Sequence, residues 1–204
     1  MRIAIVDYGL GNLRSVAGAV ERLDHEPVIT SDVEELGRAD KLILPGVGAF
    51  GDGMRNLRDR GLVEPLTELV VERRRPTLGL CLGAQLLARE SEEFGNHEGL
   101  GWIDATVRKI EPRNGLRVPH VGWNDLHRTG DSVLFEGLRE EPLFYYVHSF
   151  HIVADDPGLV RGETEYGERM TAVIEQENVF GVQFHPEKSQ LDGLTLLGNF
   201  LERA

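Results

Sequence analysis

Four short runs rich in apolar residues constrain the fold of this chain more than any other feature. They occupy residues 3–6, 27–30, 41–44 and 76–80. Helical patterns separate them: apolar residues recur on one face between Leu13 and Leu23, and two further patterns divide near Gly61. Strands without polar alternation are buried on both faces, and strands that alternate with helices form parallel sheets. The pattern predicts an α/β fold with a largely parallel central sheet flanked by helices.

The second half of the chain changes character. Mostly strand-like segments follow one another from residue 101 to 181, with Gly and Pro between them, at residues 102–110, 144–148, 159–162, 170–175 and 179–184. A final amphipathic helix is predicted from Leu191, Leu194, Leu197 and Phe200 or Leu201. Because no repeat or linker divides the chain, we expect a single domain over residues 1–204 with an added antiparallel β section.

The composition of the chain indicates its cellular compartment and argues against some classes of binding partner. The 204 residues include 34 acidic and 22 basic side chains, a formal net charge of −12, which argues against nucleic acid or an anionic membrane as the main partner. The only cysteine, Cys81, excludes an intrachain disulfide and is typical of a reducing compartment. No apolar run is long enough for a secretory signal or a spanning helix, so a cytoplasmic location is expected.

Cys81 lies at the centre of a motif that is typical of a catalytic nucleophile. Residues 79–83 read Gly-Leu-Cys-Leu-Gly where the fourth apolar run meets a helix, in the form G-x-nucleophile-x-G. The glycines permit a sharp turn, the helix N-terminus favours the thiolate, and the N–H of Leu82 is placed to stabilise an oxyanion. Most free cysteines are small buried hydrophobes, and this motif favours a catalytic thiol instead.

A candidate base and its orienting acid lie near the end of the chain. His185 follows the apolar run 179–183 and could accept the thiol proton and return it to a leaving group. Glu187, two residues on, could bind the second ring nitrogen and fix its tautomer. The order Cys, His, Glu argues against an α/β-hydrolase, in which the acid precedes the histidine.

The remaining polar patterns indicate no metal and no cofactor. His148 and His151 lie three apart on an extended segment and therefore point to opposite faces. Residues 46–51 match G-x-G-x-x-G, but no strand ending in an acid follows at the dinucleotide-binding spacing. The acidic pairs, including Glu92 and Glu93, are predicted to lie on solvated faces.

The two catalytic segments together resemble one enzyme family. Residues 79–85, Gly-Leu-Cys-Leu-Gly-Ala-Gln, and 181–187, Gly-Val-Gln-Phe-His-Pro-Glu, are similar to motifs of the class I, triad-type glutamine amidotransferases. The resemblance implies that Cys81 attacks the side-chain amide of glutamine, giving a glutamyl thioester and ammonia. It also implies that His185 is general base and acid, that Glu187 orients it, and that Gln85 helps to hold glutamine.

Four further segments resemble the glutaminase subunits of imidazole glycerol phosphate synthases. They are residues 7–16, 45–50, 119–124 and 145–150. The resemblance implies that residues 45–50 form the oxyanion loop, with the N–H of Val47 as a second donor. Because glycines flank Val47, we expect this peptide to reorient before the site works, so that the resting enzyme is poorly active.

The same resemblance implies a glutamine-binding segment. Gly48, His148, Ser149 and Phe150 are expected to contact glutamine. Phe150 departs from the family pattern, since relatives often have tyrosine there. The change should matter little if this segment meets glutamine mainly through its backbone.

Ammonia is protonated quickly in water, so a glutaminase must pass it on directly. The resemblance implies a heterodimer with a (β/α)8-barrel cyclase subunit, which receives ammonia through an internal passage and makes imidazole glycerol phosphate and aminoimidazole carboxamide ribotide. Asn12, Trp123, Tyr145 and Lys188 are expected near the contact, although the sequence leaves open whether Trp123 is interface or core. The alternatives are a glutaminase of another synthase, such as pyridoxal phosphate synthase, and a non-catalytic binding module.

Overall fold

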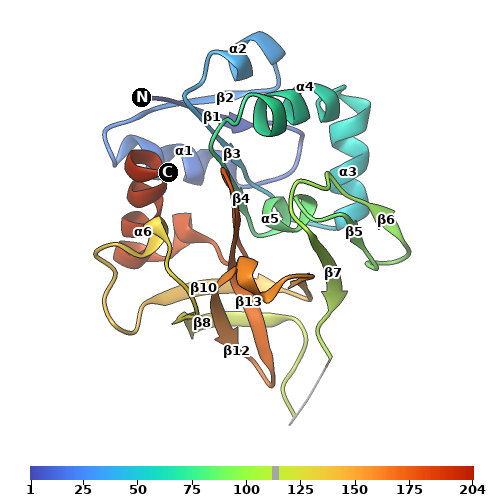
Figure 1. Ribbon diagram of the computed structural model, residues 1–204, viewed down its shortest axis with the longest axis vertical. Helices are drawn as coiled ribbons and strands as arrows, with labels where there is room; N and C mark the ends of the chain where they lie inside the picture. The colour runs from blue at the N-terminus through green and yellow to red at the C-terminus, as the bar shows by residue number, and fades with distance from the viewer. Residues whose placement is uncertain (112–114) are drawn as a thin grey trace.

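A mixed eight-stranded sheet forms the centre of the computed structural model, which describes residues 1–111 and 115–204 (Figure 1). Its strand order is β2-β1-β3-β4-β14-β13-β12-β9. The first five of these are parallel: β2 (Glu26–Thr30), β1 (Arg2–Val6), β3 (Lys41–Leu44), β4 (Thr77–Leu80) and β14 (Val179–Val182). The last three pair antiparallel: β13 (Arg169–Gln176), β12 (Val160–Glu165) and β9 (His127–Arg128). The predicted α/β fold with an added antiparallel section is confirmed.

Helices cover both faces of the parallel strands, as the uninterrupted apolar runs require. On one face lie α1 (Leu13–Glu21) and α6 (Gln190–Arg203). On the other lie α2 (Val33–Gly37), α3 (Phe50–Asp59), α4 (Val63–Thr67) with the π-helical turn η1 (Glu68–Glu72), and α5 (Leu82–Leu86). Figure 1 shows α6 on the left of the sheet and α3 on its right. Strand β1 joins the two cores, because Ile3 and Ile5 pack on one face while Ala4 and Val6 pack on the other.

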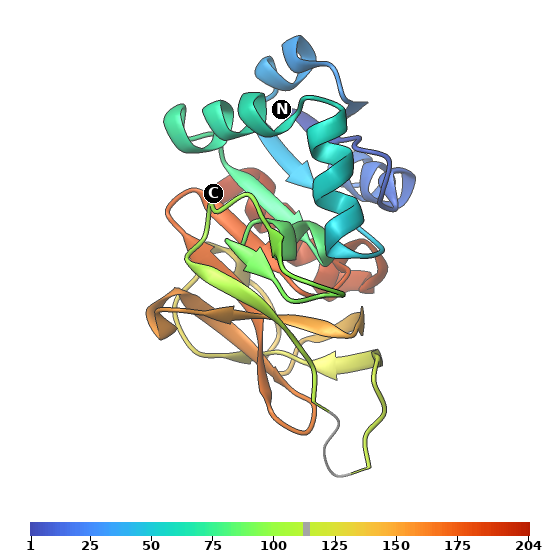
Figure 2. The ribbon, with the colours of Figure 1, turned by 90° about the vertical axis from the view of Figure 1, so that its right-hand side faces the viewer.

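Two smaller sheets complete the fold. One has the order β11-β7-β5-β6, with β11 (Phe150–Ala154), β7 (Ala105–Lys109), β5 (Glu90–Ser91) and β6 (His97–Glu98). The other is an antiparallel ribbon of β8 (His120–Asp125) and β10 (Leu143–His148), called the β8–β10 ribbon below. Figure 2 shows β8 and β10, coloured yellow to light orange, below the parallel strands β1 and β3, coloured blue to cyan. Three short helical turns lie between strands or before the last helix: η2 (Val133–Phe135) between β9 and β10, η3 (Pro157–Leu159) between β11 and β12, and η4 (Pro186–Lys188) between β14 and α6.

The prediction for the last helix was wrong at one position. Leu191, expected in the core, is 75% exposed in the first turn of α6, whereas Leu197, Phe200 and Leu201 are fully buried. Leu191 lines a surface groove with Trp123, so it adds apolar surface beside the β8–β10 ribbon instead of packing under the sheet. Strands β8 and β11, the two-residue strands β5, β6 and β9, and helix α2 were not predicted.

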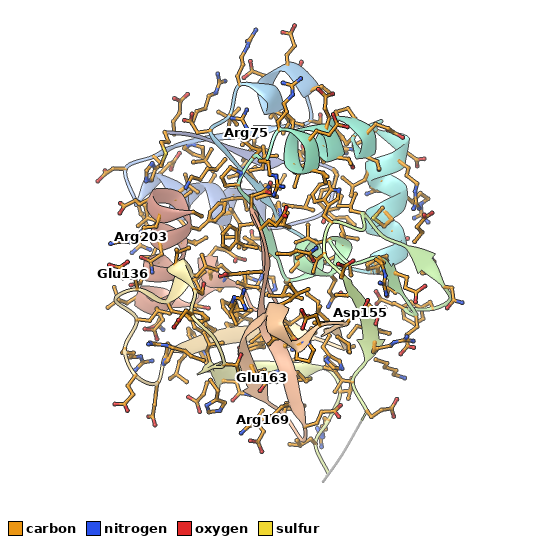
Figure 3. All side chains as sticks on the ribbon, viewed as in Figure 1. Arg75, Glu136, Asp155, Glu163, Arg169 and Arg203 are labelled. Atoms are coloured by element: carbon orange, nitrogen blue, oxygen red, sulfur yellow. The ribbon has the colours of Figure 1, made fainter. Side chains whose placement is uncertain are left out.

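Most charged side chains lie at the surface, where many of them form ion pairs; Lys41, Glu93 and Glu187 are buried exceptions. Arg203 contacts Glu136 at 2.9 Å, and Arg169 contacts Glu163 at 3.6 Å; both pairs are labelled in Figure 3. Exposed pairs of this kind contribute little to stability, about 0–1 kcal/mol each. The two apolar cores therefore hold the fold. Among the described residues, no helix has the length and apolar character needed to cross a bilayer.

Candidate active site

Cys81 lies on a strained turn between β4 and α5. Its backbone has φ +52° and ψ −109°, in the left-handed half of conformational space that non-glycine residues rarely adopt. A Cβ at Gly83 would lie 1.8 Å from the carbonyl oxygen of Leu44, and one at Gly79 would lie 2.7 Å from the Cα of Ala84. Both glycines are thus required for the close approach of the turn to β3 and α5, as a nucleophile elbow needs.

Strand pairing brings the base to this elbow. Val182 pairs in parallel register with Leu80, so the residues that follow β4 and β14 meet at one edge of the sheet. Nδ1 of His185 lies 3.0 Å from Oε1 of Glu187, and both side chains are buried. Nε2 of His185 has no hydrogen-bond partner among the described residues, which leaves it available for proton exchange.

The surroundings of His185 favour its protonated form. Burial alone would lower the pKa of this imidazole, but its interactions with Cys81 and Glu187 outweigh burial and raise the pKa to about 9. A protonated His185 next to Cys81 is placed to give a proton to a leaving group during the reaction.

One cavity of about 290 Å³ brings together nine of the residues predicted for catalysis, oxyanion stabilisation and glutamine binding. They are Val47, Gly48, Cys81, Leu82, Gln85, His148, Ser149, Phe150 and His185. Glu187 lies behind His185, outside the lining. Segments from three parts of the chain thus converge on the thiol.

Glu93 also lines the cavity, and the prediction that it lies on a solvated face was wrong. Its side chain is 9% exposed, and its Oε2 accepts a hydrogen bond of 2.6 Å from the N–H of Phe50, the first residue of α3. Burial raises the pKa of Glu93, and the Phe50 amide offsets part of that increase. The neighbouring Glu92 points outwards to Arg108, so two adjacent acids face opposite ways. No local periodicity in the sequence distinguishes them.

A second residue missed at the sequence level is Gln183, which is buried beside the thiol. Its Nε2 lies 3.8 Å from Sγ of Cys81, and its Oε1 accepts a hydrogen bond of 3.1 Å from Nε2 of Gln85. The same Gln85 nitrogen donates to the carbonyl oxygen of Phe150 at 2.8 Å. These bonds tie the elbow helix to the segment on the opposite wall of the cavity.

The loop expected to supply the second oxyanion donor is held in place at Pro45 and Gly46 and is loosely packed at Val47 and Gly48. The hydroxyl of Tyr8 donates to the carbonyl oxygen of Pro45 at 2.7 Å, and a Cβ at Gly46 would lie 2.5 Å from that hydroxyl oxygen. Gly48 has φ +110°, and a Cβ there would meet only Leu10, at 4.0 Å. Val47 between them is 40% exposed. This geometry allows the Val47 peptide to change its orientation while Pro45 and Gly46 stay in place.

Three of the four residues predicted at the partner contact form one cluster. Trp123 is 46% exposed and therefore does not belong to the core. Its ring centroid lies 6.0 Å from that of Tyr145, and Nζ of Lys188 lies 5.8 Å from the Tyr145 ring centroid. Asn12 precedes α1, and α1 contacts the turn η4 that carries Lys188.

The described parts of the chain contain no group of three or more His, Cys, Asp or Glu side chains arranged to hold a metal ion. The cavity offers the thiol of Cys81, the imidazoles of His148 and His185, and the carboxylate of Glu93. This set suits attack on an amide or ester carbonyl.

We predict that Glu187→Gln lowers the pKa of His185 from about 9 towards 6.5, because the substitution removes a buried negative charge. NMR titration of the histidine rings measures this shift, with the exposed Glu177→Gln as the matched control. A histidine pKa that is higher in the folded state increases the free energy of unfolding. This contribution is fully present below pH 6.5 and is lost as the pH rises through 9. The stability difference between wild type and Glu187→Gln should therefore shrink over that interval, and an unchanged His185 titration would contradict the assignment.

Comparison with known proteins agrees with this site. The family model for class-I glutamine amidotransferases matches residues 4–204. The imidazole glycerol phosphate synthase subunit HisH of Rhodospirillum rubrum is 48% identical over 100% of both chains, and that of Aquifex aeolicus is 45% identical over 100% of this chain and 98% of its own.

Solved structures agree on the fold. One described as a glutamine amidotransferase has a TM-score of 0.76 at 24% identity and covers 98% of this chain and 97% of its own. That of PurLQS from Thermotoga maritima has a TM-score of 0.73 at 22% identity, with the same coverage. The family match and the full-length similarity to the two HisH subunits show that the chain belongs to the class-I glutamine amidotransferases and, within them, to the HisH group.

Proposed function

We propose that the chain is the glutaminase subunit of an imidazole glycerol phosphate synthase, and that it hydrolyses L-glutamine to glutamate and ammonia. The observation that carries this proposal is the single cavity in which Cys81, His185 and the two oxyanion candidates meet. The full-length likeness to proteins named as HisH subunits of that synthase supports the choice of synthase. The lone cysteine also supports a reducing, cytoplasmic location.

The residues of the cavity suit a two-stage reaction. Sγ of Cys81 attacks the amide carbon of glutamine, and the N–H groups of Leu82 and Val47 stabilise the oxyanion that forms. Leu82 is the first residue of α5, so its N–H has no partner within the helix. His185 donates its proton to the departing nitrogen, which leaves as ammonia, and the thioester remains on Cys81. Neutral His185 then takes a proton from water, and the resulting hydroxide releases glutamate.

The opposite wall of the cavity suits recognition of the amino-acid end of glutamine. Glu93 is the carboxylate that lines the cavity apart from the triad, and the N–H of Phe50 holds it in place. We assign Glu93 to the α-ammonium group of glutamine, with Gln85 and the segment 148–150 as the other walls.

Glu93→Gln keeps the size of the side chain but removes its charge, and we predict a rise of about tenfold in KM for glutamine with kcat nearly unchanged. Steady-state glutaminase assays in the presence of the cyclase measure both constants. Glu92→Gln, which removes the adjacent exposed carboxylate, is the matched control. An equal effect of the two substitutions would refute a direct role for Glu93.

The outer face of the β8–β10 ribbon suits docking of the partner. Trp123 pairs with Tyr145 and Val121 with Val147, so all four side chains project from the same face. Val121, Trp123 and Val147 are 54%, 46% and 37% exposed. An exposed tryptophan next to a half-buried tyrosine, with a cation over the tyrosine ring, is the kind of anchor that protein interfaces use. We propose a (β/α)8-barrel cyclase as this partner, placed next to the cavity so that ammonia passes to it directly.

Trp123→Ala should weaken binding of the cyclase by about 2 kcal/mol or more, because a central aromatic anchor carries a large share of binding energy. Isothermal titration calorimetry with the purified cyclase measures the affinity. Val153→Ala, at another exposed apolar position, is the control and should leave the affinity unchanged. Normal affinity of Trp123→Ala would remove this residue from the contact.

Glutaminase assays of the chain alone, with the cyclase, and with the cyclase plus its nucleotide substrate test the proposed function as a whole. We expect little turnover alone and a clear increase with the partner, because the Val47 peptide must reorient to complete the oxyanion hole. Cys81→Ser should abolish turnover in every condition. Equal turnover with and without the cyclase would contradict the reorientation of the loop.

Labelling of Cys81 by a glutamine-analogue electrophile separates the remaining alternatives. A non-catalytic binding module would not react, even with cyclase and ligand present. A glutaminase of another synthase, such as pyridoxal phosphate synthase, would react but would not respond to this cyclase. The similarity to HisH subunits supports neither a non-catalytic binding module nor a glutaminase of another synthase.

A further inference from the structure

Two buried histidines outside the catalytic triad lie against each other on the inner face of the β8–β10 ribbon. His120 and His148 occupy paired positions of β8 and β10, with Nδ1 of His120 3.0 Å from Nε2 of His148. Their exposed fractions are 2% and 6%. His148 lines the cavity, whereas His120 lies behind it and has no part in the reaction proposed above.

The neighbours of the two rings impose one direction on their hydrogen bonds. The carbonyl oxygen of Phe150 can only accept, so Nδ1 of His148 must carry the proton that bridges their 2.8 Å separation. Nε2 of a neutral His148 must then accept, and Nδ1 of His120 must donate to it. Nε2 of His120 accepts in turn from Nδ2 of Asn124, at 3.3 Å.

The outer end of this chain is fixed as well. Oδ1 of Asn124 accepts from the N–H of Asp125 at 3.0 Å, and its Nδ2 also donates to the carbonyl oxygen of Glu165 at 2.9 Å. These contacts settle which end of the amide faces His120. Every bond from Asn124 to Phe150 therefore runs in the same direction, provided that both rings are neutral.

The environment keeps both rings neutral. Burial lowers the pKa of His120 to about 4 and that of His148 to about 3. The His120 ring is also stacked on the rings of Tyr146 and Tyr166, with centroid distances of 4.8 and 4.1 Å. The ring is thus held both by packing and by hydrogen bonds.

We infer that His120 is a positioning residue for the glutamine site, acting through His148 on the carbonyl group of Phe150; this role rests on the proposed glutaminase function. The Phe150 carbonyl oxygen also accepts from Nε2 of Gln85, at 2.8 Å. The tautomer of His148 thus determines whether its ring holds the Phe150 carbonyl group in place. That carbonyl group in turn orients Gln85, and Gln85 and the segment 148–150 line the cavity.

His120→Phe keeps an aromatic ring between the two tyrosines but removes the donor to His148. We expect KM for glutamine to rise about tenfold with kcat within about twofold, because the substrate wall loosens while the triad is unchanged. His120→Asn places an amide donor where Nδ1 lies and should recover most of the loss. Tyr166→Phe keeps the stacking and is the control, with wild-type constants expected. All variants are assayed as the full chain with the cyclase.

Nitrogen-15 NMR of the histidine rings supplies a test that does not depend on activity. Wild type should show His148 protonated on Nδ1, and His120→Phe should show a second tautomer or faster ring exchange. An unchanged KM together with an unchanged His148 tautomer in His120→Phe would overturn the inference. Equal KM values for His120→Phe and His120→Asn would also overturn it, because packing rather than the donated proton would then explain the loss.

Asn124→Ala covers the case in which His120→Phe does not fold. This partly exposed residue donates to His120, and its loss should raise KM in the same direction by a smaller factor; no rise would count against the inference. A wild-type complex that hydrolyses no glutamine, yet shows the expected His148 tautomer, would refute the proposed function and leave the hydrogen-bond chain supported.

Discussion

The left-handed backbone at Cys81 is the constraint on which the rest of the site depends. A conformation of this kind costs about 1–3 kcal/mol and persists only where its surroundings leave no alternative. Here β4 is held between β3 and β14, and the turn at Gly83 packs directly on the Leu44 carbonyl group. The parallel sheet thus fixes the direction in which the thiol projects, and α5 begins at the next residue.

The strand order then determines which residues can reach the thiol. Strand β14 borders β4 although about a hundred residues separate them in the sequence, so a histidine just beyond β14 arrives next to Cys81. The intervening chain forms the antiparallel strands and the β8–β10 ribbon, and it returns Ser149 and Phe150 to the same cavity. The added section is therefore the wall of the site as well as an extension of the sheet.

The sequence was sufficient for the parts of the protein that local patterns encode. Uninterrupted apolar runs predicted the parallel strands, and the glycines around Cys81 predicted the elbow. Glu93 was misjudged because its inward orientation depends on the N–H of Phe50, which lies in another element. Leu191 was misjudged because helical periodicity identifies an apolar face but not whether another element covers each turn of it. Strand β8 escaped notice because it carries both a glycine and polar residues on its inner face.

The β8–β10 ribbon joins the proposed docking face to the proposed glutamine site, because the side chains of a strand alternate between its two faces. Its side chains alternate, so Trp123 and Tyr145 face outwards while His120 and His148 face inwards. A slip of one residue in either strand would bury the tryptophan and expose a histidine. The histidine hydrogen bond on one face and the aromatic pair on the other both specify the observed register. A partner bound at the proposed docking face would therefore contact the same strand pair whose inner face holds the proposed substrate wall, without any long-range rearrangement of the sheet.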